Sequence, residues 1–204
     1  AVDADGEDAG ALAEIARNIE STRSALDADS CERAVDMILG ARRVAIMGYG
    51  ASSWLAGLLQ RNLERNCDYV QVLASIESSS YGARALARLR PDDLLIALSF
   101  PRYFADTVTL AGQAGKAGIP VLALTDRVTS PVARLATVAL YAHTDSQYFA
   151  NSEASALALV EGLSAAVAMR AKDSLGSAAE LAEVLLPWLQ DNAPQRVRRS
   201  SAVA

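Results

Sequence analysis

Histidine and cysteine are scarce in this sequence. Its 204 residues include one histidine, His143, and two cysteines, Cys31 and Cys67. A single histidine excludes sites that bind a metal through several histidines, and it leaves little for a Ser-His-Asp triad. The two cysteines lack the spacing of metal ligands, so we interpret them as ordinary thiols in a reducing cytosol. We therefore expect neither a bound metal nor a cofactor.

Long apolar runs and excess positive charge are also missing. No apolar run approaches the roughly 20 residues that cross a bilayer, so we expect a cytoplasmic protein with no membrane partner. The formal net charge is −5. This argues against nucleic-acid binding by the chain as given, because such proteins usually carry a basic face. We interpret the small basic cluster of Arg196, Arg198 and Arg199 as a solvated tail.

The chain begins with alanine rather than methionine, and its first eight residues are rich in aspartate and glutamate. We interpret the chain as a piece of a longer protein, cut in or near a linker. Apolar spacing predicts a helix over about 9–28. It also predicts a second helix, which begins with Asp29 or Ser30 as its cap and stops at Gly40. The expected segments are a disordered lead (1–8), linker helices (9–40), an α/β domain (41–175), a C-terminal helix (176–190) and a tail (191–204).

Within the α/β domain, short apolar runs alternate with amphipathic stretches. This alternation is typical of a parallel sheet that helices cover on both faces. We expect a doubly wound, five-stranded parallel sheet with the flavodoxin-like order 2-1-3-4-5. The predicted strands lie near 43–47, 69–73, 93–98, 120–125 and 137–141, and the predicted helices lie near 53–65, 80–89, 105–117 and 153–172, with a helical turn near 130–135. A last helix is expected over about 177–189.

The loop after the first predicted strand carries Gly48, Gly50, Ser52 and Ser53. The glycines allow a sharp turn and a close approach of ligand, and the next helix would begin near Ser53 with free N–H groups. A dinucleotide fingerprint would need a third glycine at position 53, so we discount nucleotide cofactors. The alternative interpretation is a tight turn in which Ser53 only caps the helix.

The loop after the third predicted strand runs from Ser99 to Thr107 and contains Arg102. Arg102 could pair with a phosphate or carboxylate through its fork of donors, and Thr107 lies near a helix start. In the order 2-1-3-4-5, the strand order reverses between the first and third strands, where ligands bind in such sheets. The two loops therefore predict one anion site. The alternative is that the aromatic residues of this loop pack and Arg102 is a surface charge.

Other polar residues fit more than one interpretation. Glu153 lies near a helix start, where it is either a favourable acidic residue or a carboxylate that contacts a sugar hydroxyl or amide. His143 follows the fifth predicted strand and is more often structural than a ligand in such a position. We favour a structural role for Thr125-Asp126-Arg127 and for Ser130-Pro131, which is a good helix start.

Residues from about 42 to 172 resemble the sugar isomerase (SIS) domain. The resemblance rests on Gly48-x-Gly50-x-Ser52, on the serine-led loop from Ser99 and on Ala117-Gly118-Ile119-Pro120. Thr125 and the stretch 130–136 complete it, since this stretch is similar to the family's Ser-Pro-Leu-Ala-x-x-Ala signature. One departure concerns the loop after the third strand, which usually reads Ser-x-Ser-Gly-x-Thr. Here Phe100-Pro101-Arg102-Tyr103 intervenes, and the loop is expected to be longer.

Within the family, the chain is most similar to the ligand-sensing half of RpiR-type transcriptional regulators. The resemblance implies that the full protein binds operator DNA as a homodimer or higher homo-oligomer, through an N-terminal helix-turn-helix head absent here. It also implies a response to a phosphorylated sugar, or to a sugar acid given the altered loop. The ligand-binding residues expected from the two loops and the later helix are Gly50, Ser52, Ser53, Ser99, Arg102, Thr107 and Glu153.

Two other functions stay open at this point. An aldose–ketose phosphosugar isomerase would need a base and a proton shuttle, for which Glu153 and His143 are the candidates. We favour the sensor, with no catalytic residue, because acid–base groups near the loops are few. A pure interaction module, with purely structural loops, would bind no phosphorylated small molecule. Trp188 and Leu185 are candidate dimer-interface residues.

Overall fold

A computed structural model describes residues 4–73 and 79–171. A five-stranded, all-parallel sheet has the order β2-β1-β3-β4-β5, which confirms the predicted fold class. The elements in chain order are α1 (Ala4–Ala25), α2 (Ala28–Gly40), β1 (Val44–Met47), α3 (Ser52–Leu63), β2 (Val70–Val72), α4 (Ser79–Leu86), β3 (Leu94–Leu98), α5 (Ala105–Lys116), β4 (Val121–Thr125), the 3-10 turn η1 (Ala133–Leu135), β5 (Val138–Tyr141) and α6 (Ala154–Arg170).

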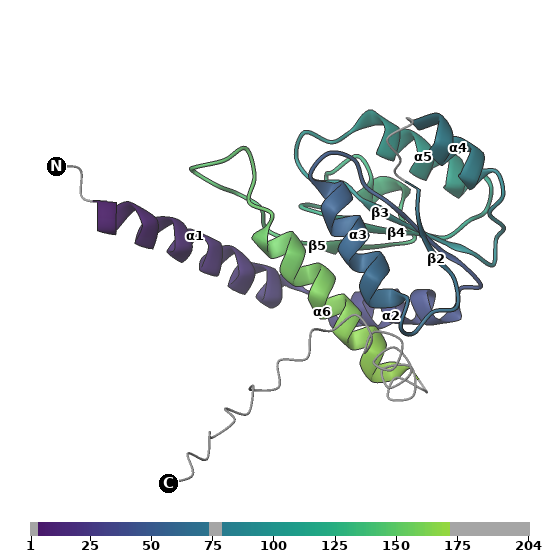
Figure 1. Ribbon diagram of the computed structural model, residues 1–204, viewed down its shortest axis with the longest axis horizontal. Helices are drawn as coiled ribbons and strands as arrows, with labels where there is room; N and C mark the ends of the chain where they lie inside the picture. Colours follow the sequence, from purple (N-terminus) through teal and green to yellow (C-terminus); the bar gives the residue numbers. More distant parts are fainter. Residues whose placement is uncertain (1–3, 74–78, 172–204) are drawn as a thin grey trace, which may run out of the picture.

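The central strands are apolar on both sides, and successive residues point to opposite faces of the sheet. Ile96 and Leu98 of β3 belong to the core on one face, and Leu95 and Ala97 to the core on the other. The first core lies under α2, α3 and α6, and the second lies under α4 and α5 (Figure 1). Burial on both faces is the physical reason why the strands appear in the sequence as short continuous apolar runs.

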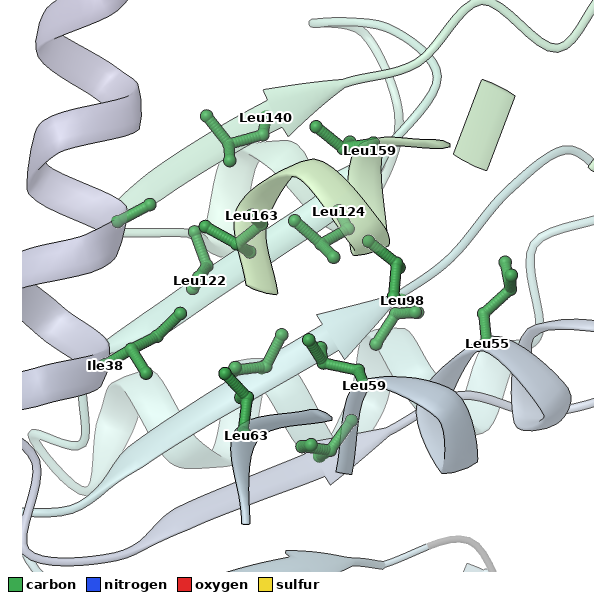
Figure 2. Packing of buried hydrophobic residues seen from close by; sticks show 14 of the residues in the cluster. Ile38, Leu55, Leu59, Leu63, Leu98, Leu122, Leu124, Leu140, Leu159 and Leu163 are labelled. Atoms are coloured by element: carbon green, nitrogen blue, oxygen red, sulfur yellow. The ribbon is translucent and has the colours of Figure 1, made fainter. Parts of the chain in front are cut away.

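The leucines of α3 and α6 fill the first core (Figure 2). Leu59 and Leu63 of α3 lie beside Leu163 of α6 and above Leu98 and Leu124 of the sheet. All five side chains are buried. Helix α6 is apolar around most of its circumference, because it packs on the sheet side and also contacts α1 and α3.

The N-terminal helices differ from the sequence expectation at their ends. The first helix starts at Ala4, so residues 4–8 are helical rather than part of a disordered lead. Asp27 caps α2 by accepting a hydrogen bond of 2.9 Å from the Ser30 N–H, in place of the expected Asp29 or Ser30. Gly40 is the last residue of α2 rather than the stop beyond it.

Several expectations fall outside the described residues. They are the helix over 177–189, the tail, and the candidate interface residues Leu185 and Trp188. Within the described ranges, no helix combines the length and the apolar character needed to cross a bilayer.

The core predicts a specific stability effect. Leu59 is fully buried, so Leu59→Ala should lower the free energy of unfolding by about 2–5 kcal/mol, since it removes apolar contacts and leaves a cavity. Leu157→Ala on α6 is the matched control, because this leucine is 39% exposed and should cost less than about 1 kcal/mol. Urea unfolding measures both changes, and equal losses would contradict the packing described.

Candidate functional site

A small recess lies at the carboxyl ends of β1 and β3, where the strand order reverses. Its volume is about 40 Å³, and residues from the loops after β1 and β3 and from the start of α6 line it. The predicted residues found in its wall are Ser52, Ser99, Arg102, Thr107 and Glu153. The helices α3, α5 and α6 all begin around this recess. Helix N-termini favour anions, so the arrangement suits a negatively charged group.

Ser99 and Thr107 are buried in the recess wall without hydrogen-bond partners. Ser99 is 3% exposed and Thr107 is 1% exposed. Within the described part of the chain, neither hydroxyl oxygen has a partner. A buried polar group that makes no hydrogen bond costs about 1–3 kcal/mol. Because both residues line the recess, their hydroxyls are candidate partners for a molecule that enters it.

Gly50 and Ser53 do not line the recess. Gly50 has φ 61°, and a Cβ at this position would lie 2.7 Å from the ring of Phe104. Gly50 therefore shapes the loop and allows Phe104 to pack closely against it. The Ser53 hydroxyl donates to the Gly50 carbonyl at 2.7 Å, which favours the helix-start interpretation of this serine over ligand contact.

Arg102 has a backbone conformation unusual for its type, with φ 69°. It is the only described residue besides glycine with positive φ. Counted from Ser99, Arg102 occupies the glycine position of the family pattern Ser-x-Ser-Gly-x-Thr. The left-handed backbone thus fits the pattern without an insertion, so we read the loop as having the usual length rather than the longer one expected from the sequence. The Arg102 side chain is exposed, and it has no hydrogen bond or ion pair within the described ranges.

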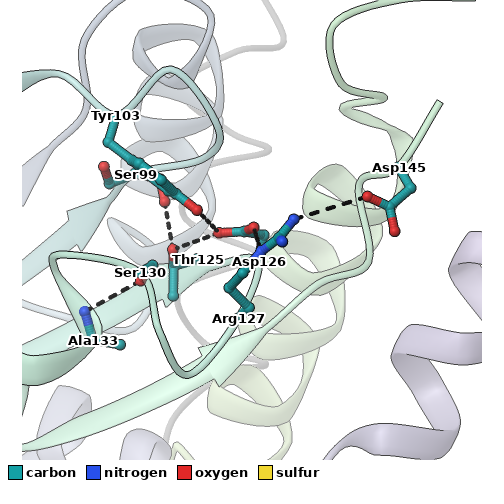
Figure 3. A network of polar contacts seen from close by, with 8 residues as sticks. All are labelled: Ser99, Tyr103, Thr125, Asp126, Arg127, Ser130, Ala133 and Asp145. Carbon is teal, nitrogen blue, oxygen red and sulfur yellow. Dashed lines mark hydrogen bonds and ion pairs between the residues drawn. The ribbon is translucent and has the colours of Figure 1, made fainter.

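A polar network behind the recess fixes the Ser99 loop (Figure 3). The Thr125 hydroxyl donates to the Ser99 carbonyl at 2.6 Å, and the Tyr103 hydroxyl donates to the Asp126 carboxylate at 2.8 Å. The side chain of Asp126 is buried and pairs with Arg127. Burial and the hydrogen bond to Asp126 raise the pKa of Tyr103 to about 12. These contacts match the structural role favoured for Thr125-Asp126-Arg127.

The two candidate acid–base residues lie in different surroundings. Glu153 precedes α6, is exposed, lines the recess and makes no capping hydrogen bond. His143 is exposed and does not line the recess, and its backbone N–H donates to the Thr22 hydroxyl at 2.9 Å. The structure therefore does not bring the pair together. Within the residues described, no cluster of three histidine, cysteine, aspartate or glutamate side chains could hold a metal ion.

The sequence analysis missed Asn151 and Tyr49, which also line the recess. Tyr49 lies between the two glycines of the first loop, and its ring contacts that of Phe104 with centroids 6.3 Å apart. Asn151 lies two residues before the Glu153 cap of α6. A polar residue just before a helix start was the available signal for Asn151.

The chain belongs to the SIS domain family. Residues 37–169 match the sequence pattern of this family. The sugar isomerase domain of an RpiR transcription factor from Sphaerobacter thermophilus is 32% identical, with a TM-score of 0.79 over 86% of this chain and 96% of that one. The Vibrio vulnificus NanR protein, solved in complex with ManNAc-6P, is 26% identical, with a TM-score of 0.78 over 89% of this chain and 69% of that one.

The curated relatives are transcriptional regulators. An uncharacterized HTH-type transcriptional regulator of Thermotoga maritima is 31% identical over 134 residues, which are 63% of this chain and 45% of the regulator. The chain spans about half the length of the curated regulators that it matches. These similarities confirm the predicted resemblance to RpiR-type regulators.

The left-handed backbone at Arg102 predicts a stabilising substitution. Arg102→Gly should raise the free energy of unfolding by about 1 kcal/mol, because glycine adopts positive φ without the steric cost that a Cβ imposes. Arg102→Ala keeps the Cβ and removes the guanidinium, so it is the control and should leave stability nearly unchanged. Urea unfolding compares the three proteins. A glycine variant no more stable than the alanine variant would contradict strain at this position.

Proposed function

We propose that this domain is the effector-sensing part of an RpiR-type transcriptional regulator and that its recess binds the phosphate of a phosphorylated sugar. The observation that carries the proposal concerns the buried hydroxyls of Ser99 and Thr107. Both residues line the recess, and neither hydroxyl has a hydrogen-bond partner among the residues that the structure describes. A folded protein leaves such groups unsatisfied at a cost, and this cost disappears when a ligand supplies the missing partners.

A phosphate has the complementary chemistry. It carries about two negative charges and several acceptor oxygens, which suit hydroxyl donors, the N-termini of α3 and α5 and the fork of the Arg102 guanidinium. Glu153 lies at the rim of the same recess, where its carboxylate can accept from a sugar hydroxyl or amide. Gly50 contributes by shaping the loop, and Ser53 by completing the helix start.

The relatives support a sensor over an enzyme. They are transcriptional regulators, and one of them was solved with the phosphosugar ManNAc-6P. An isomerase needs a base and a second proton-transfer group beside the substrate. Of the two candidates, Glu153 and His143, only Glu153 lines the recess. We therefore assign no catalytic residue to this domain.

The remaining partners follow from the regulator assignment. Operator DNA would be bound by a helix-turn-helix head in the part of the regulators that this chain does not span. A homodimer is the assembly we propose, since paired operator half-sites match a protein two-fold axis. Ligand binding would act on DNA affinity by favouring one of two arrangements of the subunits.

The recess predicts a loss of affinity in Thr107→Val. Valine keeps the shape of threonine and removes the hydroxyl, so affinity for the bound phosphosugar should fall roughly tenfold, since a hydrogen bond to a charged group contributes about 1.5–3 kcal/mol. Thermal stability should not fall, because the hydroxyl has no partner in the described structure. Thr109→Val is the matched control, since Thr109 is exposed on the same helix.

The measurement is proton NMR of the domain with a panel of sugar phosphates and sugar acids over several hours. Line broadening of one compound without conversion identifies the ligand, and titration of that compound compares the variants. Equal affinities for the wild-type and Thr107→Val proteins would contradict the recess as the phosphate site. Conversion of a compound into a second sugar would make the domain an isomerase.

A further inference from the structure

A second, larger cavity adjoins the recess and has helix α1 as one wall. Its volume is about 450 Å³, and it lies between α1 and the loop over 146–153. Arg102, Asn151 and Glu153 line both the recess and this cavity, so the two spaces meet at these residues. Sites for small molecules usually measure about 300–1,000 Å³. The recess alone is therefore too small for a sugar phosphate, and the larger cavity supplies the missing space.

Helix α1 lies outside the region that matches the SIS domain, which begins at residue 37. The α1 residues in the wall are Ala11, Glu14 and Ile15.

A regular set of hydrogen bonds holds α1 in this place. Glu14, Asn18 and Thr22 follow one another at intervals of four residues, and each bonds the backbone of an extended segment. The Glu14 carboxylate accepts from the Gln147 N–H at 3.2 Å. The Asn18 amide donates to the Asp145 carbonyl at 2.6 Å, and the Thr22 hydroxyl accepts from the His143 N–H.

The spacing of these bonds has a geometric cause. Four helical residues rise about 6 Å and two extended residues about 6.6 Å, so every fourth residue of the helix meets every second residue of the segment. The wall of the cavity is thus a fixed part of the structure rather than a loose contact.

The two spaces differ in charge. Arg102 is the one cationic side chain among the described residues that line them, and it lies where they meet. The larger cavity carries the carboxylates of Glu14 and Glu153. Glu14 is 9% exposed, so its charge acts in surroundings from which most water is excluded. An anionic end of a ligand fits the recess, and the opposite end meets acceptors and negative charge.

We infer that Glu14 of α1 determines specificity for the end of the ligand opposite the phosphate, and that this end carries hydrogen-bond donors (hydroxyl, amino or amide groups) rather than a carboxylate. The inference rests on the proposed function and narrows it. It selects phosphosugars over phosphorylated sugar acids, because a second carboxylate would lie beside Glu14 and Glu153.

The test is a set of titrations of the domain, followed by NMR, with glucose 6-phosphate, glucosamine 6-phosphate, 6-phosphogluconate and inorganic phosphate. The wild-type protein should bind glucosamine 6-phosphate at least as well as glucose 6-phosphate, and 6-phosphogluconate roughly tenfold more weakly. Glu14→Gln should remove most of this tenfold difference, because glutamine keeps an acceptor for the Gln147 N–H and loses the charge. Glu32→Gln, on the exposed side of α2, makes the same change in net charge and should leave the difference intact.

A second pair of variants tests the cavity itself. Ala11→Leu adds bulk to the cavity wall. It should weaken the binding of the sugar phosphates at least tenfold, whereas the affinity for inorganic phosphate should stay the same. Ala13→Leu places the same bulk on an exposed part of α1, so it should change neither the affinity for the sugar phosphates nor that for inorganic phosphate.

The outcomes separate the two proposals. Failure of every phosphorylated compound, inorganic phosphate included, would overturn the proposed function and this inference with it. Equal binding of 6-phosphogluconate and glucose 6-phosphate by the wild-type protein would overturn the inference alone. The inference alone would also be overturned if Glu14→Gln left the difference in affinity between glucose 6-phosphate and 6-phosphogluconate unchanged.

Discussion

The parallel pairing of β1 with β3 is the constraint on which the site depends. Val44 to Met47 pair in register with Leu94 to Ala97, so the chain leaves both strands at the same edge of the sheet. The strand order reverses here, because β2 lies on one side of β1 and β3 on the other. The following helices, α3 and α5, lie on opposite faces, and their N-termini converge without any helix crossing the gap. Apolar burial in the core thereby places polar groups at the recess.

The recess keeps several features that reduce the stability of the folded chain. Within the described residues, the buried hydroxyls of Ser99 and Thr107 have no partner, and Arg102 has a left-handed backbone. Such features persist where the surrounding structure holds them in place. Here the Thr125–Ser99 and Tyr103–Asp126 hydrogen bonds anchor the loop on both sides of Arg102 (Figure 3). The hydrogen-bond network and the unsatisfied wall of the recess thus belong to the same loop.

The sequence predicts the sheet well, because the central strands are buried on both faces and therefore stand out as short apolar runs. Ile96 and Leu95 face different cores, yet both must be apolar. Helix ends are predicted less well. Asp27 caps α2 in place of Asp29 or Ser30, because several residues that can cap a helix stand close together here. Five of the seven expected site residues line the recess. Strand order brings together the four from the loops after β1 and β3, and the fifth, Glu153, comes from the start of α6.

The larger cavity could not be predicted in the same way. It depends on how Glu14 meets the backbone of Gln147, a contact across 133 positions of sequence. A glutamate on an amphipathic helix is usually solvated, so its burial becomes visible only when α1 is placed beside the loop over 143–147. Residues whose role depends on a backbone partner elsewhere carry no signature of their own.

Helix α1 lines the larger cavity and is bonded to the segment that follows β5. Its three bonds go to backbone groups, so they depend on the path of the segment after β5 and not on the side chains of that segment. The same segment leads into the residues that line the recess, Asn151 and Glu153. A ligand that fills both spaces would contact this segment and α1 at once, and its binding energy would depend on their relative position. A shift of α1 would then change ligand affinity and, by thermodynamic reciprocity, the ligand would bias the position of α1.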